Sequence, residues 1–300
     1  MSFFAAPPRT ETTVFTRLPD RYRDARPTAW ANANRQGRPI DSFLEGPSFD
    51  RQGNLYVTDI PNGRIFRISR QGEWELVCQY DGWPNGLKIH RDGRIFITDY
   101  KRGIMVLDPQ SGKVEPLLES AGSEGFKGVN DLVFAPNGDL YFTDQGQTGL
   151  QDASGRVYKL DASGHLTCLL STIPSPNGIV FDPHLITRAQ QIWRIPLGNG
   201  SIIGKVGVFA QLHGGLGGPD GLALDAQSNL YIAHTGFGSV WKLSKVAEPL
   251  ERIVSCAGIS NTNLAFGGDD GQTLFITESE TGSILQVRTS SPGLPLYSHS

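Results

Sequence analysis

The chain has few cysteines and none of the spacings that bind zinc. Its 300 residues include three cysteines, Cys78, Cys168 and Cys256, which lie 90 and 88 residues apart. The number is odd and no CxxC or CxxH pair occurs, which argues against a disulfide framework and against a structural zinc site. We expect the three thiols to be buried side chains at equivalent positions of outer strands.

The chain also lacks a surplus of charge and any long apolar run. It carries 27 Lys and Arg against 30 Asp and Glu, a formal net charge of −3. This balance offers no basic surface for nucleic acid and no polybasic membrane anchor. No run of about 18 apolar residues is present for a membrane span, and the N-terminal apolar run is too short for a signal peptide. We therefore predict a cytoplasmic protein with no nucleic-acid or membrane partner, and its oligomeric state stays open.

What the sequence has in abundance is turn-forming residues, with 36 glycines and 19 prolines spread along the chain. Such a composition is typical of many short strands joined by tight turns. A motif recurs six times. In it a polar or acidic residue precedes glycine, or another residue in the glycine position, and alternating apolar residues follow. The polar residue falls at positions 45, 85, 130, 177, 220 and 262, so the intervals are 40, 45, 47, 43 and 42 residues. A period of this length predicts propeller blades or solenoid repeats.

The pattern inside each unit distinguishes between these two architectures. Each unit contains four short alternating segments separated by Gly, Asn or Asp turns, as in "LYFTD" and "RVYKL" of the third unit. Four such strands describe a propeller blade, and no unit has a sustained helical period. We predict an all-β, six-bladed β-propeller with four-stranded blades, as a single domain over residues 1–300. The blades begin near residues 45, 84, 129, 176, 219 and 261, and a strand at 13–19 closes the ring by completing the last blade.

The fourth unit is shorter than the others. It reads "FDPHLITRAQQIWRIPL", which lacks roughly six residues of turn and second strand near Asp182 to Leu185. Because this shortening adjoins Asn177, the unit is expected to contain either a distorted site or a pared-down strand.

The repeated polar position lies where side chains of all blades meet. The innermost strand of a blade runs along the central channel, so the residue just before it stands at one mouth of that channel. Six side chains therefore approach one axis: Glu45, Asn85, Asn130, Asn177, Asp220 and Thr262. Glu45, Asn130, Asn177 and Asp220 provide two carboxylates and two amide carbonyls, an oxygen set that suits Ca²⁺, Mg²⁺ or Mn²⁺. The alternative is that Asn-Gly and Asp-Gly pairs merely form turns, but four matching positions, one of them Glu, favour the metal site.

On these motifs, the chain resembles the gluconolactonase and senescence-marker-protein (regucalcin) lactonases over nearly all of residues 14–290. The matching motifs are "EGPSFD" with Glu45, "VNDLVF" with Asn130, "SPNGIVFD" with Asn177 and "GPDGLALD" with Asp220. The resemblance implies a six-bladed propeller with one axial divalent metal, bound by the Glu, the Asn of PNG and the Asp of PDG, with help from the earlier Asn. It also implies that Asp220 is the general base. Ca²⁺ is the first expectation for the metal, with Zn²⁺, Mn²⁺ and Mg²⁺ as alternatives.

The predicted function is metal-dependent hydrolysis of a lactone, either sugar-derived or small and aliphatic. A bound cation would polarise the carbonyl, while Asp220 takes a proton from the attacking water. Asp131 and His213 are reserve candidates for that role, and both are expected to contact the substrate together with Asn85 and Tyr100. The small-molecule substrate is the only partner that these residues imply.

Two other functions stay open. The first is a non-catalytic calcium- or ligand-binding propeller, which the short fourth unit supports best. The second is a propeller enzyme of non-hydrolytic chemistry, such as isomerisation or condensation. The long hairpin of the third unit, residues 143–158, is expected either to form a lid over the site or to be an ordinary solvated loop.

Overall fold

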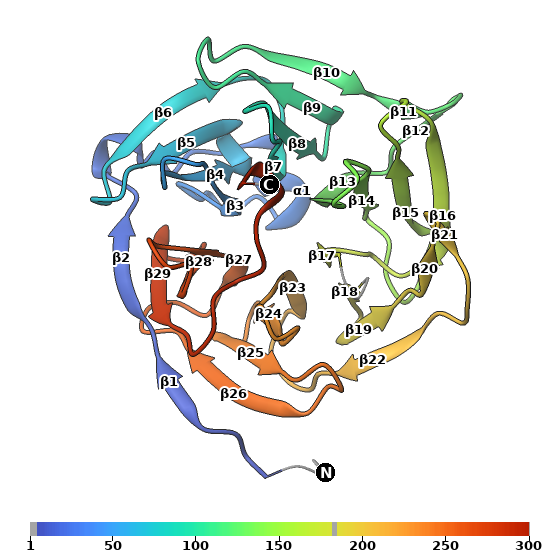
Figure 1. Ribbon diagram of the computed structural model, residues 1–300. Helices are drawn as coiled ribbons and strands as arrows, with labels where there is room; N and C mark the ends of the chain where they lie inside the picture. The colour runs from blue at the N-terminus through green and yellow to red at the C-terminus, as the bar shows by residue number, and fades with distance from the viewer. Residues whose placement is uncertain (1–4, 182–184, 300) are drawn as a thin grey trace.

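The sheets of the protein are arranged around a common axis. The computed structural model describes residues 5–181 and 185–299, without the side chains of residues 185–188. Within these residues, five four-stranded sheets and one five-stranded sheet form a ring (Figure 1), and two two-stranded pairs lie in connecting segments. The all-β propeller fold expected from the repeated units is therefore confirmed.

The first three sheets follow one pattern, in which each strand pairs antiparallel with the next along the chain. The first contains β3 (Leu44–Phe49), β4 (Leu55–Asp59), β5 (Arg64–Ile68) and β6 (Trp74–Gln79). The second contains β7 (Pro84–Ile89), β8 (Ile95–Asp99), β9 (Gly103–Leu107) and β10 (Val114–Leu118). The third contains β13 (Val129–Phe134), β14 (Leu140–Asp144), β15 (Gly155–Leu160) and β16 (Leu166–Ile173). The pair β11 (Ser120–Ala121) and β12 (Glu124–Gly125) lies between the second and third sheets in sequence.

The fourth sheet has four strands although its sequence is short. It contains β17 (Ile179–Val180), β18 (Leu185–Arg188), β19 (Gln191–Arg194) and β22 (Gly207–Gln211), with the pair β20 (Leu197–Gly198) and β21 (Ser201–Ile202) in the connection. A two-residue turn, Ala189 and Gln190, joins β18 to β19, and both residues have positive φ, +51° and +62°. Positive φ at both positions is the geometry that suits a tight hairpin. The predicted shortening near Asp182 to Leu185 falls mostly on residues 182–184, which lie outside the described residues.

Two N-terminal strands complete the last two sheets. The fifth sheet contains β23 (Pro219–Leu224), β24 (Leu230–His234), β25 (Ser239–Leu243) and β26 (Pro249–Val254), and the sixth contains β27 (Asn261–Gly267), β28 (Thr273–Glu278) and β29 (Ser283–Arg288). β2 (Thr13–Arg17) pairs antiparallel with β29 as the outermost strand of the sixth sheet, at the position where the sequence predicts a closing strand. β1 (Arg9–Glu11) pairs parallel with β26 and gives the fifth sheet a fifth strand that the sequence analysis did not predict.

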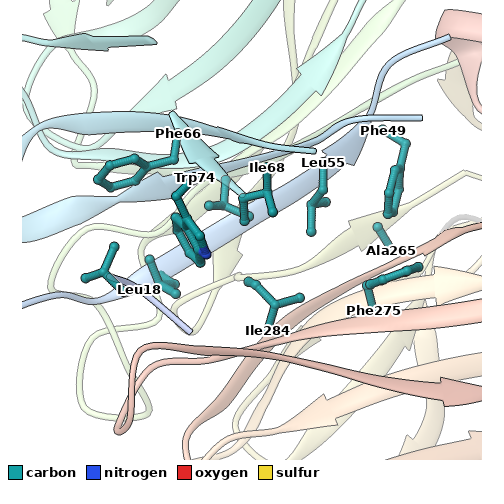
Figure 2. Close-up of a cluster of buried hydrophobic side chains, with 11 residues drawn as sticks. Leu18, Phe49, Leu55, Phe66, Ile68, Trp74, Ala265, Phe275 and Ile284 are labelled. Atoms are coloured by element: carbon teal, nitrogen blue, oxygen red, sulfur yellow. The ribbon is translucent and has the colours of Figure 1, made fainter. Parts of the chain in front are cut away.

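Apolar side chains fill the wedge between neighbouring sheets. Figure 2 shows the cluster between the first and sixth sheets, which includes Leu18, Phe49, Leu55, Phe66, Ile68, Trp74, Ala265, Phe275 and Ile284. The ring of Phe275 lies 5.0 Å from that of Phe49 and 5.2 Å from that of Phe15. These three aromatic residues come from the first sheet, the sixth sheet and the N-terminal strand β2. Their packing therefore joins the first sheet to the sixth, where the ring closes.

A short segment between β2 and β3 covers part of the ring. It contains a 3₁₀ turn (Asp20–Tyr22) and the helix α1 (Ala29–Asn34), in which Trp30 and Ala31 are buried. These two side chains pack on Ile60, and Phe43 and Trp83 lie against the same cluster. Because Ile60 directly follows β4, this cover lies at the end of the sheets where their inner strands begin. Among the described residues, no helix is long and apolar enough to cross a membrane.

The C-terminal segment lies at the opposite end of the inner strands. It runs from the sixth sheet towards the centre of the ring, as the red trace of Figure 1 shows. The Leu294 N–H donates to the carbonyl of Leu224, the last residue of β23. The Tyr297 ring stacks on Phe134, the last residue of β13, at 4.8 Å. A 3₁₀ turn (Tyr297–His299) ends the described chain.

The three cysteines lie near outer strands but are not all buried. Cys78 and Cys168 lie on β6 and β16, and Cys256 follows β26 by two residues. Cys78 is partly buried, whereas Cys168 and Cys256 are exposed. The expectation of three buried thiols is therefore wrong for two of them, because an outermost strand keeps one face in solvent.

Candidate metal centre

Buried carboxylates fix the start of the innermost strands. At the end of β4, Asp59 Oδ1 accepts a hydrogen bond of 2.8 Å from the N–H of Phe43, just before β3. At the end of β14, Asp144 Oδ1 accepts one of 2.8 Å from Gly128, just before β13. The equivalent bonds of the second and sixth sheets join Asp99 to Trp83 and Glu278 to Ser260. Burial raises the pKa of Asp59 and of Asp144, and these backbone donors and nearby cations oppose that rise.

The innermost strand is bulged at the repeated polar position. The pairing register shifts between Glu45 and Ser48 in β3 and between Pro219 and Leu222 in β23, and similar shifts occur at the start of β7, β13 and β27. A bulge removes a residue from the ladder and re-aims its side chain. In five of the six sheets, the motif found in the sequence therefore turns one side chain away from the regular alternation.

Threonine hydroxyls connect these positions from one sheet to the next. Thr58 Oγ1 of β4 donates to the carbonyl of Asn85 at 2.7 Å, and Thr143 Oγ1 of β14 donates to the carbonyl of Asn177 at 2.8 Å. The same bond joins Thr98 to Asn130, whereas Thr235 donates to the carbonyl of Asn261, the residue before the polar position Thr262. Each bond spans two sheets, so the polar positions of neighbouring sheets are held close together around the axis.

The four candidate ligands stand at the same end of their sheets. Glu45 and Asn130 are the second residues of β3 and β13, Asp220 is the second residue of β23, and Asn177 lies two residues before β17. Glu45 is 3% exposed, Asn130 4% and Asn177 9%, whereas Asp220 is partly exposed. Two carboxylates and two carboxamides are thus placed at one mouth of the ring, three of them out of solvent.

Three carboxylates influence each other at this mouth. The pKa of Glu45 is raised well above its usual value, first by burial and then by the negative charges of Asp220 and Asp131. Burial also raises the pKa of Asp131, and the positive charge of Lys88 opposes that rise. The lysine balances one negative charge, and an excess of negative charge is left that a divalent cation would balance.

The donor set decides which cation fits. No cluster of three or more His, Cys, Asp or Glu side chains with metal-binding geometry occurs in the described part of the chain. A cation here would therefore depend on the amide oxygens of Asn130 and Asn177 as well as on the two carboxylates. A set made only of oxygen atoms suits a hard ion such as Ca²⁺ better than it suits Zn²⁺.

The sixth sheet departs from the sequence prediction. Thr262 does not direct its side chain to the axis: its Oγ1 donates to the carbonyl of Leu44 at 2.8 Å. The next residue, Asn263, reaches Glu45 instead, and its Nδ2 donates to Glu45 Oε2 at 2.8 Å. The sequence contained a signal for this, because Asn263 and Asp131 occupy the position that glycine holds in the other units. A side chain at that position projects into the channel next to the ligands.

Asp220 is held by its own sheet and crowded by the next backbone. Thr235 Oγ1 lies 3.0 Å from Asp220 Oδ2. A Cβ atom on Gly178 would overlap the carbonyl of Asp220, and one on Gly221 would overlap the side chain of Asn263. The glycines of the PNG and PDG motifs are therefore required by the close approach of neighbouring inner strands.

The residues expected to contact substrate occupy different places. Asn85 is 9% exposed at the start of β7, and Asp131 is 2% exposed beside Glu45. Tyr100 follows β8 at the rim, where its hydroxyl accepts a hydrogen bond of 2.9 Å from Gln147 Nε2. His213 is exposed on the loop between β22 and β23. Asn85 and Asp131 therefore lie at the mouth and Tyr100 near its rim, and the substrate contacts of all four residues stay predictions.

The long hairpin of the third unit borders the same mouth. It connects β14 to β15 over residues 145–154, and Leu150 at its tip is 81% exposed. Its base makes a side-chain contact with the candidate centre, because Asn130 Nδ2 donates to Gln145 Oε1 at 2.8 Å. Sequence reasoning identified the length of this loop but not Gln145.

Solved structures of similar fold come from several bacteria. A gluconolactonase from Xanthomonas campestris superimposes with a TM-score of 0.72 at 21% identity, over 84% of this chain and 86% of that one. Regucalcin from Agrobacterium tumefaciens, a calcium-binding protein, superimposes with a TM-score of 0.74 at 24% identity, over 95% and 99%. At these identities the likeness shows the fold alone.

Relatives of known name are similar in sequence. The lactonase drp35 of Staphylococcus aureus (strain MRSA252) is 30% identical over 227 residues, which are 70% of this chain and 69% of the relative. The lactonase drp35 of Staphylococcus epidermidis (strain ATCC 12228) is 29% identical over 253 residues, or 79% and 74%. The family model described as the SMP-30/gluconolactonase/LRE-like region matches residues 43–280, from just before Glu45 to just after β28. By this match over most of its length, the chain belongs to the SMP-30/gluconolactonase/LRE-like family.

Proposed function

We propose that the protein is a metal-dependent lactonase, which hydrolyses a cyclic ester at the mouth of a six-bladed propeller. The observation that carries the proposal is the gathering of the Glu45 and Asp220 carboxylates with the Asn130 and Asn177 carboxamides at one end of the inner strands. Membership of a family whose relatives include lactonases supports the reaction class. Each of the six sheets counts as one blade, with β1 as an addition to the fifth.

The residues at the mouth fit one divalent cation, with Ca²⁺ as the first choice. Glu45, Asn130, Asn177 and Asp220 would hold it through oxygen atoms. Its charge would offset the burial and the negative charges of Asp220 and Asp131, which together raise the pKa of Glu45. The calcium-binding regucalcin of the same fold supports this choice. When bound, the ion supplies Lewis acidity that polarises the lactone carbonyl.

The side chains of the protein account for the remaining steps. Hydrolysis joins the water oxygen to the carbonyl carbon, breaks the ring C–O bond and transfers a proton to the departing alkoxide, which yields a hydroxy acid. Asp220 is the base that takes the proton from water, and Thr235 Oγ1 at 3.0 Å fixes its orientation. Asn85, Asp131, Tyr100 and His213 would line the substrate, either sugar-derived or small and aliphatic. A location in the cytoplasm stays a prediction.

One observation favours a second candidate function, a calcium-binding propeller without catalysis. The innermost strand of the fourth sheet, β17, has two residues, whereas β13 and β23 have six each. A short strand next to Asn177 would hold this ligand less firmly and could leave binding without turnover.

The decisive experiment combines hydrolysis with ion binding. A panel of sugar and aliphatic lactones is assayed in a pH-stat, with Ca²⁺ and with a chelator, and Ca²⁺ affinity is measured by calorimetry. We expect turnover that the chelator abolishes. Asp220→Asn keeps an oxygen ligand but loses the base, so we expect a fall in kcat of about 100-fold or more with Ca²⁺ still bound. Asp269→Asn is the matched control, because Asp269 is exposed between β27 and β28, at the end of the channel opposite the candidate ligands.

The outcomes separate the candidates. Calcium binding without hydrolysis of any lactone supports the non-catalytic function. Wild-type protein that binds no divalent ion and hydrolyses no lactone contradicts both.

A further inference from the structure

The carboxamide of Asn130 poses an orientation problem. Its oxygen can ligate a cation and its NH₂ group cannot, so a ligand role requires that the amide be turned one way. In the structure Asn130 Nδ2 donates to Gln145 Oε1 at 2.8 Å. This bond ties down the nitrogen end and leaves Oδ1 as the end available to an ion.

Gln145 is itself held firmly by the base of the long hairpin. Its N–H donates to the carbonyl of Gly128 at 2.9 Å, and the N–H of Gly146 donates to the same carbonyl at 3.1 Å. Its own carbonyl accepts a hydrogen bond of 2.6 Å from Thr148 Oγ1. Two backbone hydrogen bonds and one from the Thr148 side chain therefore fix the point from which the Gln145 side chain extends to Asn130.

The same hairpin base also reaches the segment before Asn177. Thr148 Oγ1 accepts a hydrogen bond of 2.9 Å from the N–H of Ser175. Ser175 is 2% exposed and has φ +50°, a left-handed conformation that is unfavourable for a non-glycine residue. The bond to Thr148 helps to hold that conformation two residues ahead of Asn177.

A continuous set of hydrogen bonds thus runs from one candidate ligand to the other. It passes from Asn130 to Gln145, then to Thr148 and to Ser175, and so reaches the chain that carries Asn177. These two ligands belong to neighbouring sheets, and the threonine bond from Thr143 to the Asn177 carbonyl joins the same sheets on the axial side.

We propose that Gln145 is a positioning residue that orients the Asn130 carboxamide, and that the hairpin base around Thr148 sets the separation of Asn130 from Asn177. The inference rests on the proposed metal site. It assigns the first residues of the long hairpin to ion binding.

The first test measures Ca²⁺ affinity by calorimetry, with the midpoint of thermal unfolding measured on the same samples. Gln145→Leu removes the acceptor, and we expect Ca²⁺ affinity to fall about 10- to 100-fold. Gln145→Glu keeps an acceptor for Asn130 Nδ2, so we expect affinity within about threefold of wild type. Gln147→Leu, the same change two residues further along the hairpin, removes a bond to Tyr100 and should leave Ca²⁺ affinity unchanged.

A double-mutant cycle then tests the direction of the hydrogen bond. Asn130→Asp alone is tolerated, because Gln145 can rotate its amide and donate Nε2 to the new carboxylate. In the double variant Asn130→Asp with Gln145→Glu, two carboxylates face each other and neither can donate a hydrogen bond. We expect the double variant to lose at least about 10-fold more Ca²⁺ affinity than the two single changes together. Additive losses would contradict the proposed orientation.

A readout without metal separates this inference from the proposed function. The side-chain NH₂ of Asn130 should be protected from hydrogen exchange in the metal-free wild type and lose that protection in Gln145→Leu, as ¹⁵N NMR can measure. Equal exchange in both proteins, or equal Ca²⁺ affinity of Gln145→Leu and wild type, would overturn the inference. A wild type that binds no divalent ion but shows the protected NH₂ would instead remove the proposed metal and leave the orientation established.

Discussion

At the residue scale, the Thr235 hydroxyl contacts both a candidate ligand, Asp220, and the backbone of the neighbouring sheet. Thr235 Oγ1 lies 3.0 Å from Asp220 Oδ2 and 2.5 Å from the carbonyl of Asn261. The first contact orients a carboxylate that is proposed as both ligand and base. The second joins the fifth sheet to the sixth. One hydroxyl therefore links the position of Asp220 to the spacing of two sheets.

Removing this hydroxyl should weaken the centre more than it weakens the fold. For Thr235→Val we expect Ca²⁺ affinity and kcat/KM to fall about 10-fold, because Asp220 loses the group that orients it. Thr235→Ser keeps the hydroxyl and should stay within about twofold of wild type. Calorimetry and initial rates on a lactone measure both quantities. Equal affinity and rate in Thr235→Val and wild type would show that Asp220 needs no such support.

The cysteines give a second residue-scale prediction, which concerns pH. Burial raises the pKa of the Cys78 thiol to about 11, and only the thiolate reacts with alkylating reagents. At pH 8 about one Cys78 in a thousand is ionised, and the fraction rises about 100-fold by pH 10. We expect iodoacetamide at pH 8 to label the exposed Cys256 first in the native protein and to spare Cys78 until the protein unfolds. Cys168 is exposed but burial raises its pKa too, so it should react more slowly than Cys256. Peptide mass spectrometry measures this order, and labelling of Cys78 as fast as Cys256 would contradict it.

At the element scale, the two N-terminal strands have unequal importance. β1 adds three residues to the edge of a sheet that already has four strands, whereas β2 is the outermost strand of the sixth sheet. β2 also carries Phe15, whose ring meets Phe275, and Thr16, whose Oγ1 accepts a bond of 3.0 Å from Trp74 Nε1. Loss of β2 would therefore expose both an unpaired edge and part of the cluster of Figure 2.

Two truncations test this difference. Deletion of residues 1–11 removes β1 and should lower the midpoint of thermal unfolding by no more than about 3 °C. Deletion of residues 1–17 also removes β2, and we expect a fall of about 10 °C together with self-association through the free edge of β29. Calorimetry and light scattering measure the two effects. Equal midpoints for the two truncations would show that β2 does not close the ring.

Local patterns explain why most elements could be predicted and some could not. Strands such as "LYFTD" recur at a fixed period, so the sequence alone identifies them. α1 has only six residues: Thr28 caps its N-terminus, and Trp30 packs on Ile60, a contact that no local pattern reveals. Asn263 was missed because the motif singles out the polar residue before the glycine position, and not a side chain that replaces the glycine itself. Gln145 was missed because its contact with Asn130 joins residues 15 apart in the chain and follows no sequence motif.

At the scale of the whole molecule, the candidate ion site and the C-terminal segment lie at opposite ends of the central channel. The candidate ligands stand where the inner strands begin, and the C-terminal segment crosses where they end. An inner strand of six residues spans about 20 Å, so the two regions lie on opposite ends of the channel. The sequence repeats predict which residues lie at the end with the candidate ligands, since every unit contributes one polar residue to it. The second end is formed by a segment outside the repeats, and its path depends on contacts with several sheets at once.

This separation predicts that the C-terminal segment supports stability and not ion binding. Tyr297 stacks on Phe134 at 4.8 Å and lies under the guanidinium of Arg91 at 4.3 Å. For Tyr297→Ala we expect a fall of about 5 °C in the midpoint of thermal unfolding, because the stacked ring is lost. Tyr297→Phe keeps the ring and should lose no more than about 1 °C. Ca²⁺ affinity should stay within about twofold in both variants, because about 20 Å of rigid strand lies between Tyr297 and the ligands. A loss of affinity in Tyr297→Ala with the fold intact would mean that the two ends of the channel are coupled through the inner strands.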